Sequence, residues 1–284
     1  MNIKKCVKLI EKQKIDFDEN DLKFLTYQNK KWDSLSLRNK KQVIRMLSNI
    51  LCKKIGIPIV PVRFREKLKN EDAEGTCEFR SHRLNYGLFS IPLYKRITTS
   101  YKKDSLTHNF SHNLELVMHE LRHAVYGNVF KSVSKKEKCD KLIENLNNPF
   151  LQETMKNYIY SDPVIKPNGK IKKILRPKEI DADGFSCKNL WDLYGMVKDE
   201  KFKKQLANCT IKRLDTQYRI FEAEKNNLRD DLIGLTESNL IMNLCGFKPE
   251  KAKVPVKSKI DQASTKVIVP IENTVVKKAN NIEK

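Results

Sequence analysis

The sequence predicts an α+β fold in which a small mixed sheet packs on one central helix and additional helices complete the core. Two patterns support this class. Several segments repeat apolar residues at three- and four-residue spacing, which is typical of amphipathic helices. Two segments between residues 57 and 93 are instead rich in β-branched and aromatic residues, which favours strands. With 284 residues and 39% hydrophobic content, the chain can bury at least one substantial core.

The first part of the chain is predicted to be helical. Residues 1–36 are expected to form short, charged helical pieces. Residues 37–55 have a clearer helical repeat of apolar residues, and Gly56 and Pro58 end the pattern. We therefore expect an amphipathic helix over residues 37–55 that packs on the core.

Strands are expected next. Residues 57–64 (IPIVPVRF) alternate and are β-branched, and Pro61 indicates an edge strand or a bulge because proline has no N–H to donate. Residues 77–93 are predicted to form two short strands that meet near residues 85–87. These strands would form the sheet beside the central helix.

The central helix is predicted over residues 112–128, and it contains the sequence HELRH at residues 119–123. Successive residues of a helix are about 100° apart, so His119 and His123 share one face with Glu120 beside them. The apolar residues fall on roughly the opposite side, which predicts that the helix rests on the core and presents the histidines to a cleft. That apolar side consists of Leu114, Val117, Met118, Leu121 and Val125.

This HExxH pattern indicates zinc chemistry. Two histidines four residues apart can bind one Zn²⁺ ion, and the neighbouring Glu120 can act as a general base. Zinc lowers the pKa of its water toward ~7, so that a carboxylate can take a proton and the hydroxide can attack a carbonyl. A pair of core histidines is the structural alternative, but such a pair would lie within the apolar side of the helix.

A third ligand is available further along the chain. Catalytic zinc takes three protein ligands and keeps one position for water. Glu179 and Asp183 lie one turn apart at the start of a helix predicted over residues 177–194. Glu179 can bind the metal while Asp183 accepts the second ring proton of a ligand histidine. The alternative is a solvated acidic first turn that only complements the helix dipole.

The two motifs together resemble a known family. HELRHAVYG (119–127) followed by EIDADGF (179–185) is similar to the gluzincin metallopeptidases, including the ImmA/IrrE-like peptidases and bacterial and phage-associated HELRHA domains. The resemblance implies a zincin-like domain with His119, His123 and Glu179 as zinc ligands. It also implies that Glu120 is the catalytic base and that Asp183 supports a ligand.

The resemblance is incomplete in two respects. The interval from His123 to Glu179 is longer than in compact members, which implies an insertion at about residues 131–176. In addition, no residue is assigned to stabilise the oxyanion, and His112 is either a cleft residue or part of a solvated helix end. The tyrosines that could stabilise the oxyanion are Tyr126, Tyr158, Tyr160 and Tyr194.

The rest of the chain is predicted to be helical up to a basic tail. Helices are expected near residues 135–146 and 151–159, followed by a loop. A further charged amphipathic helix is expected over residues 198–243. The resulting division is an N-terminal helical segment (1–36), a zincin-like catalytic domain (37–195), a C-terminal helical region (196–245) and a disordered basic tail (246–284).

The charge composition of the chain limits which binding partners are expected. The formal net charge of +21 could attract nucleic acid, an anionic membrane or an acidic protein. However, the excess is mostly lysine and is spread along the chain, whereas a nucleic-acid site concentrates basic residues on one stripe. Nucleic-acid binding is therefore not expected, although charge alone leaves it open. Arg83–Ile91 is the candidate edge along which a protein or peptide substrate would add as a strand. The alternative is that this segment is an ordinary strand of the sheet.

The cysteines and the N-terminus indicate the compartment. The seven cysteines are odd in number and never form CxxC, so reduced thiols are expected. We find no secretory signal and no run of ~18 apolar residues that would span a membrane. The sequence thus predicts a cytoplasmic zinc metallopeptidase of unknown oligomeric state. The alternative is a non-catalytic, basic interaction protein with a degenerate or structural metal site.

Overall fold

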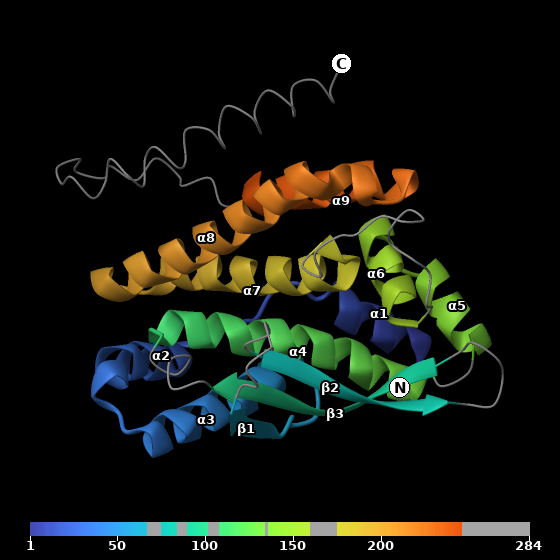
Figure 1. Cartoon of the computed structure of the whole chain (residues 1–284). Coiled ribbons are helices and arrows are strands. Elements are labelled where there is room, and N and C mark those ends of the chain that lie inside the picture. Colours follow the sequence, from blue (N-terminus) through green and yellow to red (C-terminus); the bar gives the residue numbers. More distant parts are fainter. Residues whose placement is uncertain (67–74, 84–89, 102–107, 134–135, 160–174, 246–284) are drawn as a thin grey trace.

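A computed structural model describes residues 1–66, 75–83, 90–101, 108–133, 136–159 and 175–245 (Figure 1). The chain begins with three α-helices, and the strands follow them. The elements up to the last strand are α1 (Ile3–Glu11), α2 (Glu19–Lys31), α3 (Leu37–Ile55), β1 (Val62–Glu66), β2 (Gly75–Arg83) and β3 (Ser90–Tyr101). The elements that follow are α4 (Phe110–Ser132), α5 (Lys136–Glu144), α6 (Pro149–Ile159), α7 (Pro177–Met196), α8 (Glu200–Glu224) and α9 (Asp230–Cys245).

Local sequence explains where these helices begin and end. The Ser36 side chain accepts a hydrogen bond from the backbone of Asn39 at the start of α3, and Gly56 ends that helix with φ of 89°. The Asn109 side chain caps α4 in the same way. Pro177 occupies the first turn of α7, where its missing N–H costs nothing. The predicted helix over residues 37–55 is confirmed, and the helix predicted over 177–194 extends two residues further.

The strands form one mixed sheet in the order β1-β3-β2. Strand β1 runs parallel to β3 with Val62 opposite Ile97, and β2 runs antiparallel to β3 with Gly75 opposite Thr99. Both β2 and β3 lie against α4 (Figure 1). The predicted small mixed sheet next to the HExxH helix is therefore present.

The predicted fold class, α+β, is nevertheless wrong, because the protein is mainly α-helical. Nine α-helices lie within the described residues. The buried apolar side chains that the structure describes lie mostly on helices, with a few on the segments that join elements. On β1, the partly buried Val62 and Phe64 pack against this core. A three-stranded sheet covers one side of α4, so other helices must cover the remaining sides.

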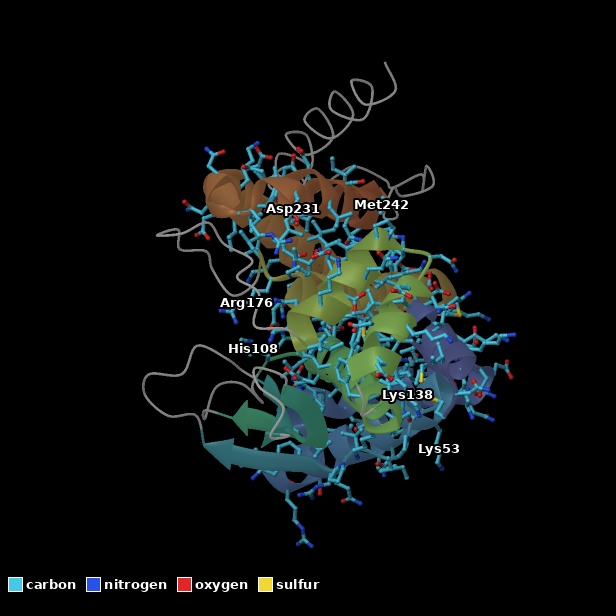
Figure 2. The ribbon with its side chains drawn as sticks, turned by 90° about the vertical axis from the view of Figure 1, so that its right-hand side faces the viewer. Lys53, His108, Lys138, Arg176, Asp231 and Met242 are labelled. Atoms are coloured by element: carbon cyan, nitrogen blue, oxygen red, sulfur yellow. The ribbon has the colours of Figure 1, made fainter. Side chains whose placement is uncertain are left out.

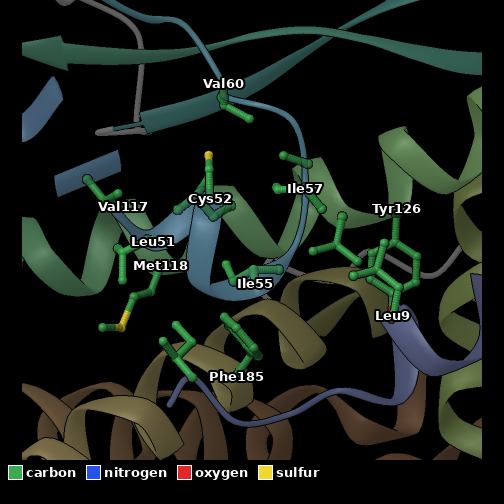
Figure 3. Close-up of a cluster of buried hydrophobic side chains, with 14 of the residues drawn as sticks. Leu9, Leu51, Cys52, Ile55, Ile57, Val60, Val117, Met118, Tyr126 and Phe185 are labelled. Carbon is green, nitrogen blue, oxygen red and sulfur yellow. The ribbon is translucent and has the colours of Figure 1, made fainter. Parts of the chain in front are cut away.

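Helix α4 is at the centre of this helical core. It packs against α7, α3, α8 and α1 as well as against the sheet. In Figure 3, side chains from four helices meet around it, including Leu9 of α1, Leu51 of α3, Met118 of α4 and Phe185 of α7. Because helices enclose it, α4 is buried on every side rather than along one stripe.

Several boundaries differ from the sequence-based expectation. The strand predicted over residues 57–64 begins only at Val62, and the segment before it leaves α3 with Ile57 and Val60 buried. The helix predicted over residues 198–243 is two helices, α8 and α9, with a 3₁₀ turn at Lys225–Asn227 between them. The predicted strand junction near 85–87 lies outside the described residues, as do most of the expected substrate edge and the whole tail from residue 246.

Some of the basic side chains are exposed on the surface. Lys53, Lys138 and Arg176 are exposed and lie at separate places around the molecule in Figure 2. Among the helices that the structure describes, none is both long enough and apolar enough to cross a bilayer. The division into a catalytic domain and flanking regions stays a prediction.

Candidate metal centre

Helices α4 and α7 bring the two motifs together. His119 and His123 lie one turn apart on α4, and Glu179 lies in the first turn of α7. The two helices pack side by side although about sixty residues separate their motifs (Figure 1). The carboxylate of Glu179 therefore faces both imidazoles.

The donor atoms have the spacing of a metal site. The Nε2 atoms of His119 and His123 are 3.1 Å apart, and Glu179 Oε2 lies 3.5 Å from each of them. Ligands about 2.0–2.1 Å from one tetrahedral ion are separated by about 3.3 Å, which matches these distances. His119, His123 and Glu179 can therefore hold one metal ion.

The other ring nitrogen of each histidine is also engaged. His119 Nδ1 lies 2.7 Å from Asp183 Oδ1, and since a carboxylate only accepts, this nitrogen carries the proton. His123 Nδ1 is hydrogen bonded to the hydroxyl of Tyr158 on α6. Partners on Nδ1 fix the two rings with Nε2 directed at the metal position, as metal-binding histidines require.

Neighbouring charges shift the pKa values of His119 and Glu179 in opposite directions when no metal is bound. Burial of the His119 imidazole lowers its pKa, but the negative charges of Asp183, Glu179 and Glu120 outweigh this and raise the pKa well above its usual value. Burial likewise raises the pKa of Glu179, but hydrogen bonds from His119 and His123 lower it well below its usual value. A metal ion would therefore have to replace a proton on His119.

The histidines are less accessible than the sequence predicted. His119 is 9% exposed, His123 7% and Glu120 3%. Helix α4 is buried both on its apolar side and on its HExxH side, and α7 and α8 pack against it. A cavity of about 420 Å³ borders α7, but Asp181 and Phe185 line it and none of the three donor residues does.

A second buried ion pair joins the same two helices. Arg122, inside HExxH, is fully buried, and its Nε lies 2.6 Å from Asp181 Oδ2. The Tyr126 hydroxyl donates to the same carboxylate at 2.9 Å, and Arg122 Nη2 donates to the backbone oxygen of Ile10 at 2.8 Å. This network fixes α4 against α7 and against the last turn of α1.

His112 belongs to a different group. It can approach Glu115 and Cys209, which together resemble a metal-binding set. However, Arg213 donates to both carboxylate oxygens of Glu115, and burial raises the pKa of Cys209 to about 12. The Glu115 carboxylate is therefore already engaged by a cation from α8.

The structure thus brings together His119, His123, Glu179 and Asp183, with Glu120 buried beside them. Three of the candidate tyrosines are described by the structure. Tyr158 is hydrogen bonded to His123, Tyr126 donates to Asp181, and Tyr194 stacks on Trp191. Tyr160 lies outside the described residues. Sequence reasoning missed the partnership of Arg122 with Asp181. Opposite charges inside the two motifs were its only signal.

Comparison with protein-family models, with curated proteins and with solved structures found no match for this chain. The gluzincin resemblance accordingly rests on the two short motifs. The geometry of the metal centre carries the functional argument.

Proposed function

We propose that this chain is a zinc-dependent metallopeptidase that hydrolyses peptide bonds in a protein or peptide substrate. The ligands are His119, His123 and Glu179, and Glu120 is the general base. The single observation that carries the proposal is the tetrahedral spacing of the three donor atoms, with Glu120 adjacent to one of them on the same helix.

The donor set favours zinc. Two imidazole nitrogens and one carboxylate oxygen are typical of catalytic zinc sites, which take three protein ligands and leave the fourth position for water. Ca²⁺ and Mg²⁺ prefer sets made of oxygen alone. When bound, Zn²⁺ supplies Lewis acidity, which acidifies a coordinated water and activates a carbonyl.

The chain's own residues have separate tasks. Glu120 follows His119 directly and is 3% exposed, so its carboxylate can accept a proton in a site that excludes most bulk water. Asp183 holds the proton on His119 Nδ1 and thereby keeps Nε2 available for the metal. Tyr158 orients His123 from α6.

The test combines metal content with hydrolysis. The wild-type chain should bind one equivalent of zinc and cleave fluorescently labelled casein. Glu120→Gln should keep the zinc and lose at least 100-fold of the activity, since general-base catalysis contributes about 10²–10⁴-fold. His119→Ala should lose both. Zinc-dependent cleavage by Glu120→Gln at the wild-type rate would remove Glu120 from the mechanism.

Burial of the ligands favours one second candidate, a structural metal site in a basic interaction protein. His119 and His123 are each less than a tenth exposed, as in sites that hold a fold together. That candidate predicts zinc binding without hydrolysis, and salt-sensitive binding of nucleic acid or of an acidic protein by the metal-free chain. A single experiment separates the two: nucleic-acid binding and casein cleavage are measured on the same preparation, with and without zinc.

A further inference from the structure

Helix α8 reaches the metal centre although it carries none of the ligands. Both carboxylate oxygens of Asp183 are engaged: Oδ1 by His119 Nδ1 at 2.7 Å, and Oδ2 by Gln217 Nε2 of α8 at 3.0 Å. Asp183 is 1% exposed and Gln217 is fully buried. The orientation of the carboxylate that supports His119 is therefore set from the opposite side by α8.

Arg213, one turn before Gln217, adds a charge to this contact. Its Nε and Nη2 donate to the two carboxylate oxygens of Glu115 at 3.1 Å each, and its Nε lies 3.7 Å from Asp183 Oδ1. Glu115 is 1% exposed and lies one turn before His119 on α4. One guanidinium thus lies between two buried carboxylates that come from the two helices of the metal site.

Such an arrangement is expected to hold the site in place. A buried carboxylate is costly unless it is paired with a cation and its oxygens are hydrogen bonded. The Arg213 fork has the planar, bidentate geometry that fixes a carboxylate in two directions. Partners of this kind, one contact away from a ligand, set the orientation of the ligand and change metal affinity when they are removed.

We propose that Gln217 and Arg213 are positioning residues of the metal centre. Gln217 fixes the carboxylate of Asp183, and Arg213 holds Glu115 of α4 and Asp183 of α7 around one cation, so that His119 presents Nε2 to the metal. This inference rests on the metal centre of the proposed function, but it does not depend on catalysis.

The test measures zinc affinity of the full-length chain by competition with a chromophoric chelator. Gln217→Met keeps most of the side-chain volume and removes the N–H donor, so it should fold and weaken zinc binding by roughly 10-fold. Arg213→Met should weaken it at least as much, and Arg213→Lys should restore part of the loss. Arg219→Met is the matched control, because Arg219 is on the same helix with its side chain 64% exposed, and it should bind zinc as the wild type does.

A double-mutant cycle separates positioning from a general effect on the fold. Asp183→Ala should weaken zinc binding by about 10–100-fold, and adding Gln217→Met should weaken it no further, because the amide acts through Asp183. The absorption bands of bound Co²⁺ should shift in Gln217→Met but not in Arg219→Met. Wild-type affinity and an unchanged Co²⁺ spectrum in Gln217→Met would overturn the proposal.

The readout also separates this inference from the peptidase proposal. A chain that binds zinc with the predicted pattern of affinities but leaves casein intact would keep the positioning role and refute the peptidase. A chain that binds no zinc would refute both. Additive losses in the double mutant would refute the positioning role alone.

Discussion

His119 is the residue at which the chemistry of this protein is concentrated. One ring nitrogen is held by Asp183, and the other lies within 3.5 Å of both His123 and Glu179. The surrounding carboxylates raise its pKa well above the usual value despite burial. The same imidazole could thus hold a metal ion when it is neutral, while its raised pKa favours the protonated form when no metal is bound.

This dual character gives zinc binding a pH dependence. Only the neutral imidazole donates its Nε2 lone pair, so a proton competes with zinc at every pH below the raised pKa of His119. The apparent zinc affinity should therefore rise with pH across the neutral range, by about 10-fold per pH unit where one proton is displaced. Chelator competition between pH 6 and 8.5 measures this. An affinity independent of pH over that range would show that His119 is not charged in the metal-free protein.

At the scale of the elements, the pairing of α4 with α7 is what creates the site. Arg122 and Asp181 join these helices by a buried ion pair next to the candidate ligands. Arg122 also donates to the backbone oxygen of Ile10 in α1 and to that of Lys12 just after it. Helix α6 adds Tyr158 and helix α8 adds Gln217. Four helices therefore position the three candidate ligands.

Arg122→Met should destabilise the protein by about 3–5 kcal/mol, because it leaves the Asp181 carboxylate buried without its cation. Adding Asp181→Asn should recover part of this loss by removing the stranded charge. Urea unfolding monitored by circular dichroism gives both values. Lys23→Met, at an ion pair whose two side chains are 72% and 86% exposed, should change the free energy of unfolding by at most about 1 kcal/mol. A loss for Arg122→Met as small as that of the control would mean that the ion pair does not hold α4 against α7.

For the whole molecule, a metal ion held by His119 and His123 of α4 and by Glu179 of α7 would couple metal binding to global stability. A ligand that binds only the folded state stabilises it by about 2.7 kcal/mol when its free concentration is 100 times Kd. Zinc should therefore raise the Tm of the full chain, and a strong chelator should reverse the change. His123→Ala should show neither response. If the wild type had the same melting curve with zinc and with chelator, no zinc ion would be bound between α4 and α7 and the prediction would be wrong.

Short-range patterns in the sequence are good predictors where a side chain acts together with neighbours a turn away. The helix ended by Gly56, the spacing of His119 and His123, and the acidic start of α7 all follow from helical geometry within one element. The same patterns missed how deeply α4 is buried. A helical wheel shows which residues of one helix are polar. It does not include the polar partners from other helices that allow His119, Glu115 and Arg122 to be buried.

Those partners lie far along the chain, and only packing brings them within reach. Asp183 meets His119 across 64 residues, and Arg213 meets Glu115 across 98. The tertiary structure also determines that helices form most of the core. The α+β prediction rested on β-branched segments and did not consider how many sides of α4 other elements must cover. Local backbone geometry thus specified which residues can bind a metal, whereas the long-range pairing of charges decided how they are held and how far water can reach them.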